Sequence, residues 1–344
     1  MKNQAEEIRA FILEKIPEHP KDIVAVTASQ FSVSRTTVHR HLNKLAKDNK
    51  IIKTGTTNKA TYFLFSSRDK TIETKITPKV DEHEIWKNNF ERDFASLREN
   101  VYGICDYGFT EILNNAIVHS EGTSIYVKTE WSEGAVDIFV ADNGIGIFQK
   151  IKTALNLKDI RESILELSKG KVTTDPERHT GEGIFFTSRA FDEFAINANG
   201  LTYIKLNIED DWFVETQKGR QKEGTFISMK IRFNSGRTLQ QVFGSYSNSE
   251  TYRFDKTHIL VKLSKFEEDK YISRSQAKRL LTGLEKFRDI IFDFKGITTV
   301  GQGFVDEIFR VFKNKHPEIK IRFCNENNDV KFMIKRGLPT LEDE

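Results

Sequence analysis

Two stretches decide the fold of the middle of this chain: FTEILNNAIVHS at residues 109–120 and VDIFVADNGIGI at residues 136–147. In the first stretch, apolar residues recur at the spacing of one helix face. Glu111, Asn115 and His119 lie four residues apart and therefore share the other face. A carboxylate can orient and deprotonate water, and an amide oxygen one turn away can ligate a hard cation that bridges phosphates. The pattern predicts a helix that presents a base and a cation ligand together.

The second stretch is an alternating strand that runs into Asp142 and then turns at Gly144 and Gly146. A carboxylate at the end of a strand, beside a flat pocket, is well suited to accept a hydrogen bond from the exocyclic amine of adenine. The two glycines allow a tight turn and leave room for the base and ribose. The second stretch therefore predicts a nucleotide-base pocket.

Two shorter motifs follow in the order expected of a nucleotide site. In HTGEGIFFTSRAF, residues 179–191, Gly181 and Gly183 precede a helix whose free N–H groups can face phosphates. In KEGTFISMKI, residues 222–231, Thr225 opens a strand. Each motif alone is weak evidence, whereas the set of four in this order is specific.

Together the four motifs resemble the N, G1, G2 and G3 boxes of the GHKL superfamily, which includes gyrase-type and mismatch-repair ATPases, histidine kinases and anti-sigma-factor kinases. The resemblance implies an α/β sandwich at 86–250 that binds ATP and Mg²⁺, with a mobile lid at about 148–180. The roles it implies are general base for Glu111, Mg²⁺ ligand for Asn115, adenine anchor for Asp142, base-pocket lining for Gly144 and Gly146, phosphate contact for Gly181 and Gly183, and water-mediated adenine contact for Thr225. For His119 the resemblance leaves two roles open: a phosphate contact, or an interaction with the dipole at the C-terminal end of the helix. The GEGIFF motif has no lysine, so the phosphate cation is expected from the lid, Arg178 or Arg189.

Residues 1–68 read as helix, helix, turn, helix and β-hairpin, an order similar to that of a winged helix-turn-helix. Asp22 is expected to cap the second helix, Ser34 to cap a third at 35–48, and GTTNK to form the hairpin turn. This segment has twelve Lys/Arg against six Asp/Glu, a net charge of +6 on a chain whose total is +3. We therefore expect DNA as a partner through residues 22–60, read by Ser34, Arg35, Thr36, Thr37, His39 and Arg40. The alternative is a protein-docking module with solvated basic residues.

A polar linker is expected at 69–85 and a small α/β domain at 251–344. The latter alternates strands (HILVKL, IIFDF, IKIRFCN) with helical stretches at 275–287, 303–313 and 329–336. IIFDFKGITTVGQGFVDEIF resembles the central strand-to-helix turn of STAS-like domains. In that family the phosphoacceptor is a Ser at the start of the helix, where this chain has no hydroxyl; Thr298 and Thr299 lie just before the turn. The resemblance therefore favours a module that docks or transmits without being phosphorylated.

The bulk properties favour a cytoplasmic protein. No apolar run approaches the length of a membrane span, and the N-terminus lacks the pattern of a signal peptide. Cys105 and Cys324 lie far apart within hydrophobic patterns, and no Cys/His cluster has metal-ligand spacing, so we expect two buried thiols. The sequence leaves the oligomeric state undecided; a homodimer is one candidate, since winged-helix proteins often pair on palindromic sites.

The overall expectation is a multidomain α/β regulator: a winged helix (α+β), a GHKL sandwich and a small βαβ STAS-like domain. It would be a slow ATPase that couples nucleotide state to DNA or a protein partner. One alternative is an anti-sigma-type kinase acting on a separate partner. In a histidine-kinase reading His83 would be the acceptor, but it lacks the proline that usually follows. Another alternative is a DNA-binding regulator that senses ATP without turnover.

Overall fold

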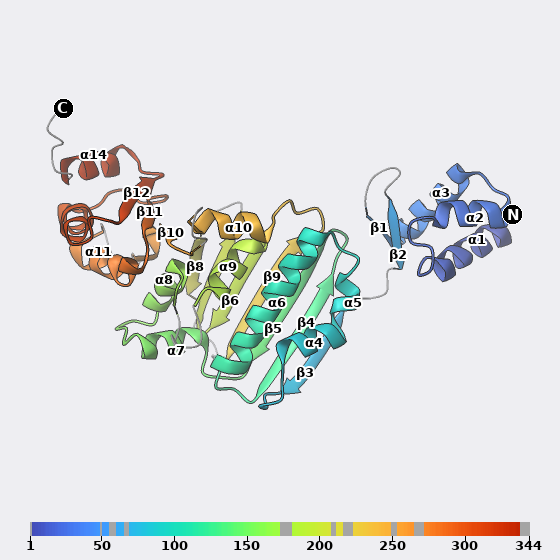
Figure 1. Ribbon diagram of the computed structural model, residues 1–344, viewed down its shortest axis with the longest axis horizontal. Coiled ribbons are helices and arrows are strands. Elements are labelled where there is room, and N and C mark those ends of the chain that lie inside the picture. The colour runs from blue at the N-terminus through green and yellow to red at the C-terminus, as the bar shows by residue number, and fades with distance from the viewer. Residues whose placement is uncertain are drawn as a thin grey trace.

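The computed structural model describes residues 2–48, 50–54, 60–64, 69–172, 181–207, 211–215, 223–248, 253–264 and 272–337. Their strands form three sheets, and their buried apolar side chains form two cores. Figure 1 shows a small N-terminal module at one end, the large sheet in the middle and a third sheet at the other end. The chain is thus a multidomain α/β protein. Within the described ranges, no helix combines the length and apolar character that a membrane crossing requires.

The N-terminal module has its own hydrophobic core. It consists of α1 (Lys2–Lys15), α2 (Ile23–Phe31), α3 (Arg35–Lys47) and an antiparallel hairpin, β1 (Ile51–Thr54) with β2 (Thr61–Leu64). Ser34 caps α3 as predicted, since its hydroxyl oxygen accepts a hydrogen bond from the Thr37 N–H over 3.1 Å. Asp22 stands before α2 but makes no side-chain cap bond; its carboxylate lies 3.2 Å from the His19 ring. The predicted turn at 55–59 lies outside the described residues.

The central domain is a seven-stranded antiparallel sheet with helices packed on it (Figure 1). The strand order is β3-β4-β5-β9-β6-β7-β8. The strands are β3 (Lys70–Lys75), β4 (Ser124–Trp131), β5 (Ala135–Asp142), β6 (Glu193–Ala198), β7 (Leu201–Leu206), β8 (Asp211–Glu215) and β9 (Thr225–Arg232). The helices are α4 (Glu82–Asn89), α5 (Glu91–Phe94), α6 (Glu99–His119), α7 (Ile147–Ala154), α8 (Glu162–Lys169), α9 (Gly183–Ala190) and α10 (Leu239–Tyr246).

The position of β9 brings the sequence motifs together. Although β9 is the last strand of this sheet in the chain, it pairs with β5 on one side and β6 on the other. The long helix α6 packs over β5 and β9 and against α9. The first residue of β9 therefore lies beside the last residue of β5, under the helix that carries Glu111 and Asn115.

The prediction of a linker at 69–85 is wrong for the residues that belong to a strand and to the start of a helix. Residues 70–75 form β3, which pairs with β4 as an edge strand, and α4 begins at Glu82. The side chains of KTIETK alternate between half-buried and exposed, with Ile72 packed against the core. A strand with one apolar residue among charged and hydroxyl side chains resembles a linker in composition, because only one of its faces meets the core.

The C-terminal domain has a three-stranded parallel sheet, β10 (Lys256–Leu260), β11 (Asp289–Asp293) and β12 (Lys320–Cys324). Its helical segments are η2 (Val261–Ser264), α11 (Arg274–Leu281), η3 (Leu284–Lys286), a continuous run of α12 (Gln302–Val305), η4 (Asp306–Phe312) and α13 (Lys313–Lys315), and α14 (Asn328–Gly337). The predicted alternation of three strands and three helical stretches is confirmed.

The segment expected as a lid, 148–180, carries two packed helices in its described part. Helix α8 is buried from Ser163 to Lys169 and packs against α9, β10 and η2. The remainder of the segment, 173–180, lies outside the described residues. Helix α8 therefore joins the central domain to the C-terminal domain, and both contribute to one hydrophobic core.

Candidate functional site

A cavity between α6, α7, α9 and the ends of β5 and β9 collects the residues singled out in the sequence. It contains about 1090 Å³ of space, part of it open to solvent. Eight of the nine predicted nucleotide-site residues line it: Glu111, Asn115, His119, Asp142, Gly146, Gly181, Gly183 and Thr225. The four motifs, whose outermost lining residues Glu111 and Thr225 are 114 positions apart in the chain, thus meet at one place.

Helix α6 supplies the polar face of the cavity. Glu111, Asn115 and His119 follow one another on successive turns and all line it. The amide nitrogen of Asn115 donates a hydrogen bond to the backbone carbonyl of Glu111 over 2.7 Å. This bond commits the nitrogen to the helix, so the amide oxygen is the Asn115 atom that suits a hard cation.

Asp142 ends β5 and is held by the neighbouring strand. Its Oδ1 accepts hydrogen bonds from the N–H groups of Gly144, over 2.8 Å, and of Thr225, over 3.2 Å. Burial raises the pKa of Asp142, and the hydrogen bonds from Gly144 and Thr225 oppose that rise. Thr225 also accepts a hydrogen bond from the Ile147 N–H over 3.1 Å, which fixes the start of α7. The carboxylate is therefore both buried and oriented.

Gly144 does not line the cavity, which corrects its predicted role in the base pocket. A Cβ atom at this position would overlap the backbone carbonyl of Ser120, just after the end of α6. The glycine is needed because the loop after β5 packs directly on the α6 terminus. Its contribution to the site is indirect, since that contact sets the distance between the two motifs.

Gly183, at the start of α9, lies directly against Glu111. A Cβ atom added to Gly183 would overlap the Glu111 carboxylate oxygen Oε2. The glycine therefore gives the carboxylate the space that it occupies at the N-terminal end of α9. This contact joins the first and third motifs.

Lys150 of α7 is a cationic side chain among the described residues of the cavity lining, and the sequence reasoning did not name it. Its ammonium lies 2.9 Å from the Glu121 carboxylate. Lys150 belongs to the segment expected as a lid, one of the three sources proposed for a phosphate cation. Its signal in the sequence was its position one turn into the helix after DNGIGI.

Arg189, the second proposed source of a phosphate cation, does not line the cavity. Its guanidinium is buried, stacks 3.4 Å from the centre of the Phe185 ring and donates hydrogen bonds to the carbonyls of Phe185 and Ser168. It lies on the face of α9 that packs against α8 and the aromatic core, because that helix turns its Gly183 end to the cavity. Arg178, the third source, lies outside the described residues.

Glu182 is a further lining residue that sequence reasoning missed. Burial raises its pKa, and the nearby Lys171 opposes the rise. Among the described residues, the cavity lining therefore holds three carboxyl groups, from Glu111, Asp142 and Glu182, beside one lysine. Such an oxygen-rich donor set fits a divalent cation.

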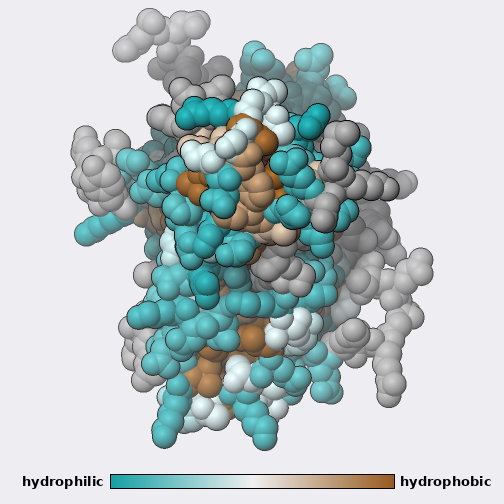
Figure 2. All heavy atoms as spheres, turned by 90° about the vertical axis from the view of Figure 1, so that its right-hand side faces the viewer, coloured by the Kyte–Doolittle hydropathy of each residue, from teal (hydrophilic) through white to brown (hydrophobic). Residues whose placement is uncertain are grey.

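The residues predicted to read DNA lie at the N-terminal end of α3. Ser34, Arg35, Thr36, His39 and Arg40 are exposed, whereas Thr37 is half-buried with its hydroxyl 2.9 Å from that of Ser34. The opposite face of α3, Val38, Leu42 and Leu45, is buried in the module's core. Figure 2, viewed from the side of this module, shows a mostly hydrophilic described surface with small hydrophobic areas. The predicted residues thus share one solvent-facing end of a helix, with Thr37 only partly accessible.

Comparison with known protein families identifies one segment of the chain. Residues 276–331 match the family described as STAS-like domain of unknown function (DUF4325). The matched segment extends from α11 into α14 and includes β11 and β12. The STAS-like character expected of the C-terminal domain is therefore confirmed. A comparison with curated proteins gives no significant match.

Proposed function

We propose that the central domain is a GHKL-type ATP-binding domain and that the protein is a regulator whose DNA- or partner-binding state depends on ATP and Mg²⁺. The observation that carries this proposal is the convergence of four separate motifs on one cavity. A chance collection of turns and solvated helix faces would have no reason to share a cavity. The order of the motifs and their common location together favour a nucleotide site.

The chemistry of the lining supports a role for each part. The Asp142 carboxylate would accept the exocyclic amine of adenine, with Thr225 holding that carboxylate in position. The Asn115 amide oxygen would ligate Mg²⁺. The positive charge held there would offset that of the carboxyl groups and of the phosphates. Lys150 and the N–H groups near Gly181 and Gly183 would contact the phosphates.

Glu111 is the residue that would act as general base in slow hydrolysis. It lines the cavity one helical turn from Asn115, so a water molecule near the cation ligand would be within reach of its carboxylate. The first alternative is an anti-sigma-type kinase that transfers the phosphoryl group to a separate protein. The second is a DNA-binding regulator that senses ATP without turnover. All three share the same binding step and differ in where the phosphoryl group goes.

The packing of α8 supports a coupling between nucleotide and C-terminal domain. Helix α8 lies between the second and third motifs in the chain, and Lys169 at its end donates hydrogen bonds to the carbonyls of Arg279 and Thr282 in the STAS-like domain, each over 2.9 Å. A change in this segment on ATP binding would be felt directly by α11. For the N-terminal module, the exposed basic end of α3 supports a winged-helix contact with DNA.

A binding experiment tests the proposal. A fluorescent ATP analogue is titrated with the full chain in the presence and absence of Mg²⁺, and Asn115→Ala, Asp142→Asn and Asp137→Asn variants are compared with the parent. Asp137 lies on β5, like Asp142, but its position alternates to the other face of the sheet. We expect Mg²⁺-dependent binding that is lost in the first two variants and kept in the control. A parent protein that ignores the analogue would overturn the proposal.

The fate of the γ-phosphoryl group then separates the alternatives. Labelled ATP that yields free phosphate supports an ATPase, label on a protein supports a kinase, and binding without either supports a sensor. Glu111→Ala is expected to abolish hydrolysis while sparing binding. Turnover that persists in this variant would refute the assignment of Glu111 as the base.

A further inference from the structure

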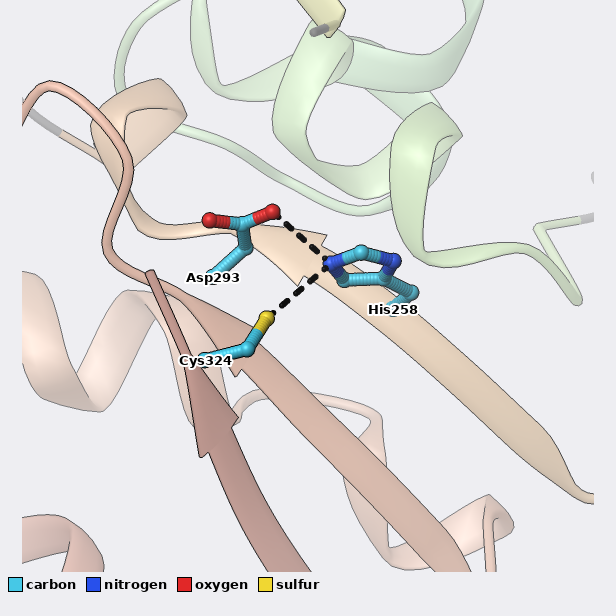
Figure 3. A group of neighbouring side chains, drawn as sticks. All are labelled: His258, Asp293 and Cys324. Carbon is cyan, nitrogen blue, oxygen red and sulfur yellow. Dashed lines mark hydrogen bonds and ion pairs between the residues drawn. The ribbon is translucent and has the colours of Figure 1, made fainter. Parts of the chain in front are cut away.

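Three potential metal ligands come from three adjacent strands of the C-terminal sheet (Figure 3). Asp293 and Cys324 end β11 and β12 and are direct register partners. His258 lies on β10 two residues before Leu260, the register partner of Asp293 on that side. In an in-register parallel sheet, residues paired across strands and residues two apart along a strand share a face. The topology therefore brings the three side chains to one face of the sheet.

The donor atoms of these side chains converge on one point. The Nε2 atom of His258 lies 3.0 Å from Oδ2 of Asp293 and 3.8 Å from the Cys324 sulfur. All three donor atoms lie within 4.8 Å of one another. A tetrahedral zinc ion with ligand distances of about 2.0–2.3 Å needs donor separations of about 3.3–3.6 Å. To reach that range, the His258–Asp293 distance would lengthen and the His258–Cys324 distance would shorten, each by a few tenths of an ångström.

The Asp293 carboxylate is oriented by a second layer of hydrogen bonds. Its other oxygen, Oδ1, accepts from the Asn325 side-chain amide over 3.0 Å and from the Lys295 N–H over 2.9 Å. These bonds turn Oδ2 toward His258 and Cys324 (Figure 3). Ligating carboxylates in metal sites are commonly held by outer partners of this kind.

The arrangement does not suit a cysteine nucleophile. A Cys–His–Asp triad needs the thiol and the carboxylate on opposite nitrogens of the imidazole, whereas here both face Nε2.

We propose that His258, Asp293 and Cys324 form a zinc-binding site, with the fourth coordination position open to water. One nitrogen, one oxygen and one sulfur donor suit a borderline transition-metal ion, whereas Mg²⁺ and Ca²⁺ prefer oxygen ligands alone. Binding would release the thiol proton, because the thiolate is the ligand. The site is separate from the proposed nucleotide cavity and does not depend on it.

The three proposed ligands lie partly inside and partly outside the segment that matches the STAS-like family. Asp293 and Cys324 lie inside the matched segment 276–331, and His258 lies before it. Strand β10 also contacts α8, where the Thr257 hydroxyl donates a hydrogen bond to the Lys169 carbonyl over 2.7 Å. A metal ion here would hold the strand that meets the central domain to the other two strands of the sheet.

The test uses the full chain, stripped of metal by a chelator and titrated with Zn²⁺ against a chromophoric competitor. Co²⁺ is added in parallel, because a thiolate ligand gives it a charge-transfer band in the near ultraviolet. The variants are His258→Ala and Cys324→Ala. Their matched controls are His316→Ala, in the same domain, and Cys105→Ala, in the central domain. A further variant, Asn325→Gly, removes the amide that orients Asp293 and suits the left-handed backbone at that position, φ +55°.

We expect one tightly bound Zn²⁺ per chain and a Co²⁺ band in the parent and in both controls. Both signals should be lost in the two ligand variants. Asn325→Gly should weaken Zn²⁺ binding by about 10–100-fold. If circular dichroism shows that a ligand variant is unfolded, the Zn²⁺ affinity of Asn325→Gly is the deciding measurement. Absence of stoichiometric binding by the parent, or unchanged affinity in a folded Cys324→Ala or Asn325→Gly variant, would overturn the proposal. Asn115→Ala should leave Zn²⁺ binding unchanged, which separates this site from the nucleotide cavity.

Discussion

The ammonium group of Lys169, near the C-terminal end of α8, donates a hydrogen bond over 2.9 Å to the backbone carbonyl of Thr282, which follows the last residue of α11. The same ammonium lies 2.6 Å from the Glu166 carboxylate, and the two side chains are 2% and 9% exposed. Desolvation lowers the pKa of Lys169, and the charge of Glu166 opposes that shift. A cation at the C-terminal end of a helix also meets the negative end of its dipole. A buried ion pair thus joins the segment between the second and third sequence motifs to the STAS-like domain.

Replacing Lys169 alone should be strongly destabilising. Lys169→Met leaves the Glu166 carboxylate buried without its partner and the α11 carbonyls without a donor, a loss of about 3–5 kcal/mol in the free energy of unfolding. The double variant Glu166→Gln/Lys169→Met should recover part of the loss, because it leaves no buried charge. Urea denaturation measures both. Equal urea midpoints for the parent and Lys169→Met would contradict the buried-pair account.

The affinity for the ATP analogue should fall on acidification at a pH above the ordinary pKa of aspartate. Burial raises the pKa of Asp142 in the folded protein. Protonation of Asp142 therefore adds to the free energy of unfolding, and this contribution is lost as the pH rises through the raised pKa. The ionised form, present above that pKa, is the stronger acceptor for the adenine amine. Titrations of the parent between neutral and acidic pH should show this loss of affinity. An affinity that stays constant over that range would remove Asp142 from the base pocket.

Gly183→Ala should impair turnover more than binding. The added Cβ would displace the Glu111 carboxylate, which is the flexible end of its side chain, so the fold should tolerate the change. General-base catalysis contributes about 100–10,000-fold, and partial misplacement should cost at least about tenfold in the hydrolysis rate. Gly236→Ala is the matched control, because a Cβ there meets no atom within 4 Å in the described structure. Hydrolysis at the parent rate in Gly183→Ala would disconnect Glu111 from the reaction.

Arg35→Ala and Arg40→Ala should weaken binding to duplex DNA in gel-shift assays. Both side chains are exposed at the end of α3. Each phosphate contact removed should lower the slope of log affinity against log salt by about 1. Lys331→Ala, exposed on α14 in the C-terminal domain, controls for the loss of one positive charge. A DNA affinity that falls equally with Lys331→Ala would indicate a nonspecific charge effect.

Sequence pattern predicted the features of this protein that rest on local periodicity. The Ser34 cap, the helix carrying Glu111 and Asn115, the strand ending at Asp142 and the alternation of the C-terminal domain all follow from spacing within about 12 residues. Edge strand β3 was read as a linker because only one face of it meets the core, so its composition is polar.

The features that were missed depend on how distant segments pack. Lys150 of α7 lines the cavity, whereas Arg189 lies on the side of α9 that packs against α8. Cys324 was expected to be a buried thiol, because the sequence has no Cys/His cluster at metal-ligand spacing. It is half-buried beside His258, 66 residues away, because β10, β11 and β12 are in parallel register. Asp293 joins them for the same reason. Spacing rules for metal ligands describe short loops, and they do not detect a cluster built across a sheet.

The most direct test of the central claim is a crystal structure of the chain grown with Mg²⁺ and a non-hydrolysable ATP analogue. The account predicts one nucleotide in the cavity under α6, with the adenine amine on Asp142 and a metal ion on the Asn115 oxygen. A nucleotide bound elsewhere, or Asp142 and Asn115 both without contact to it, would contradict the account.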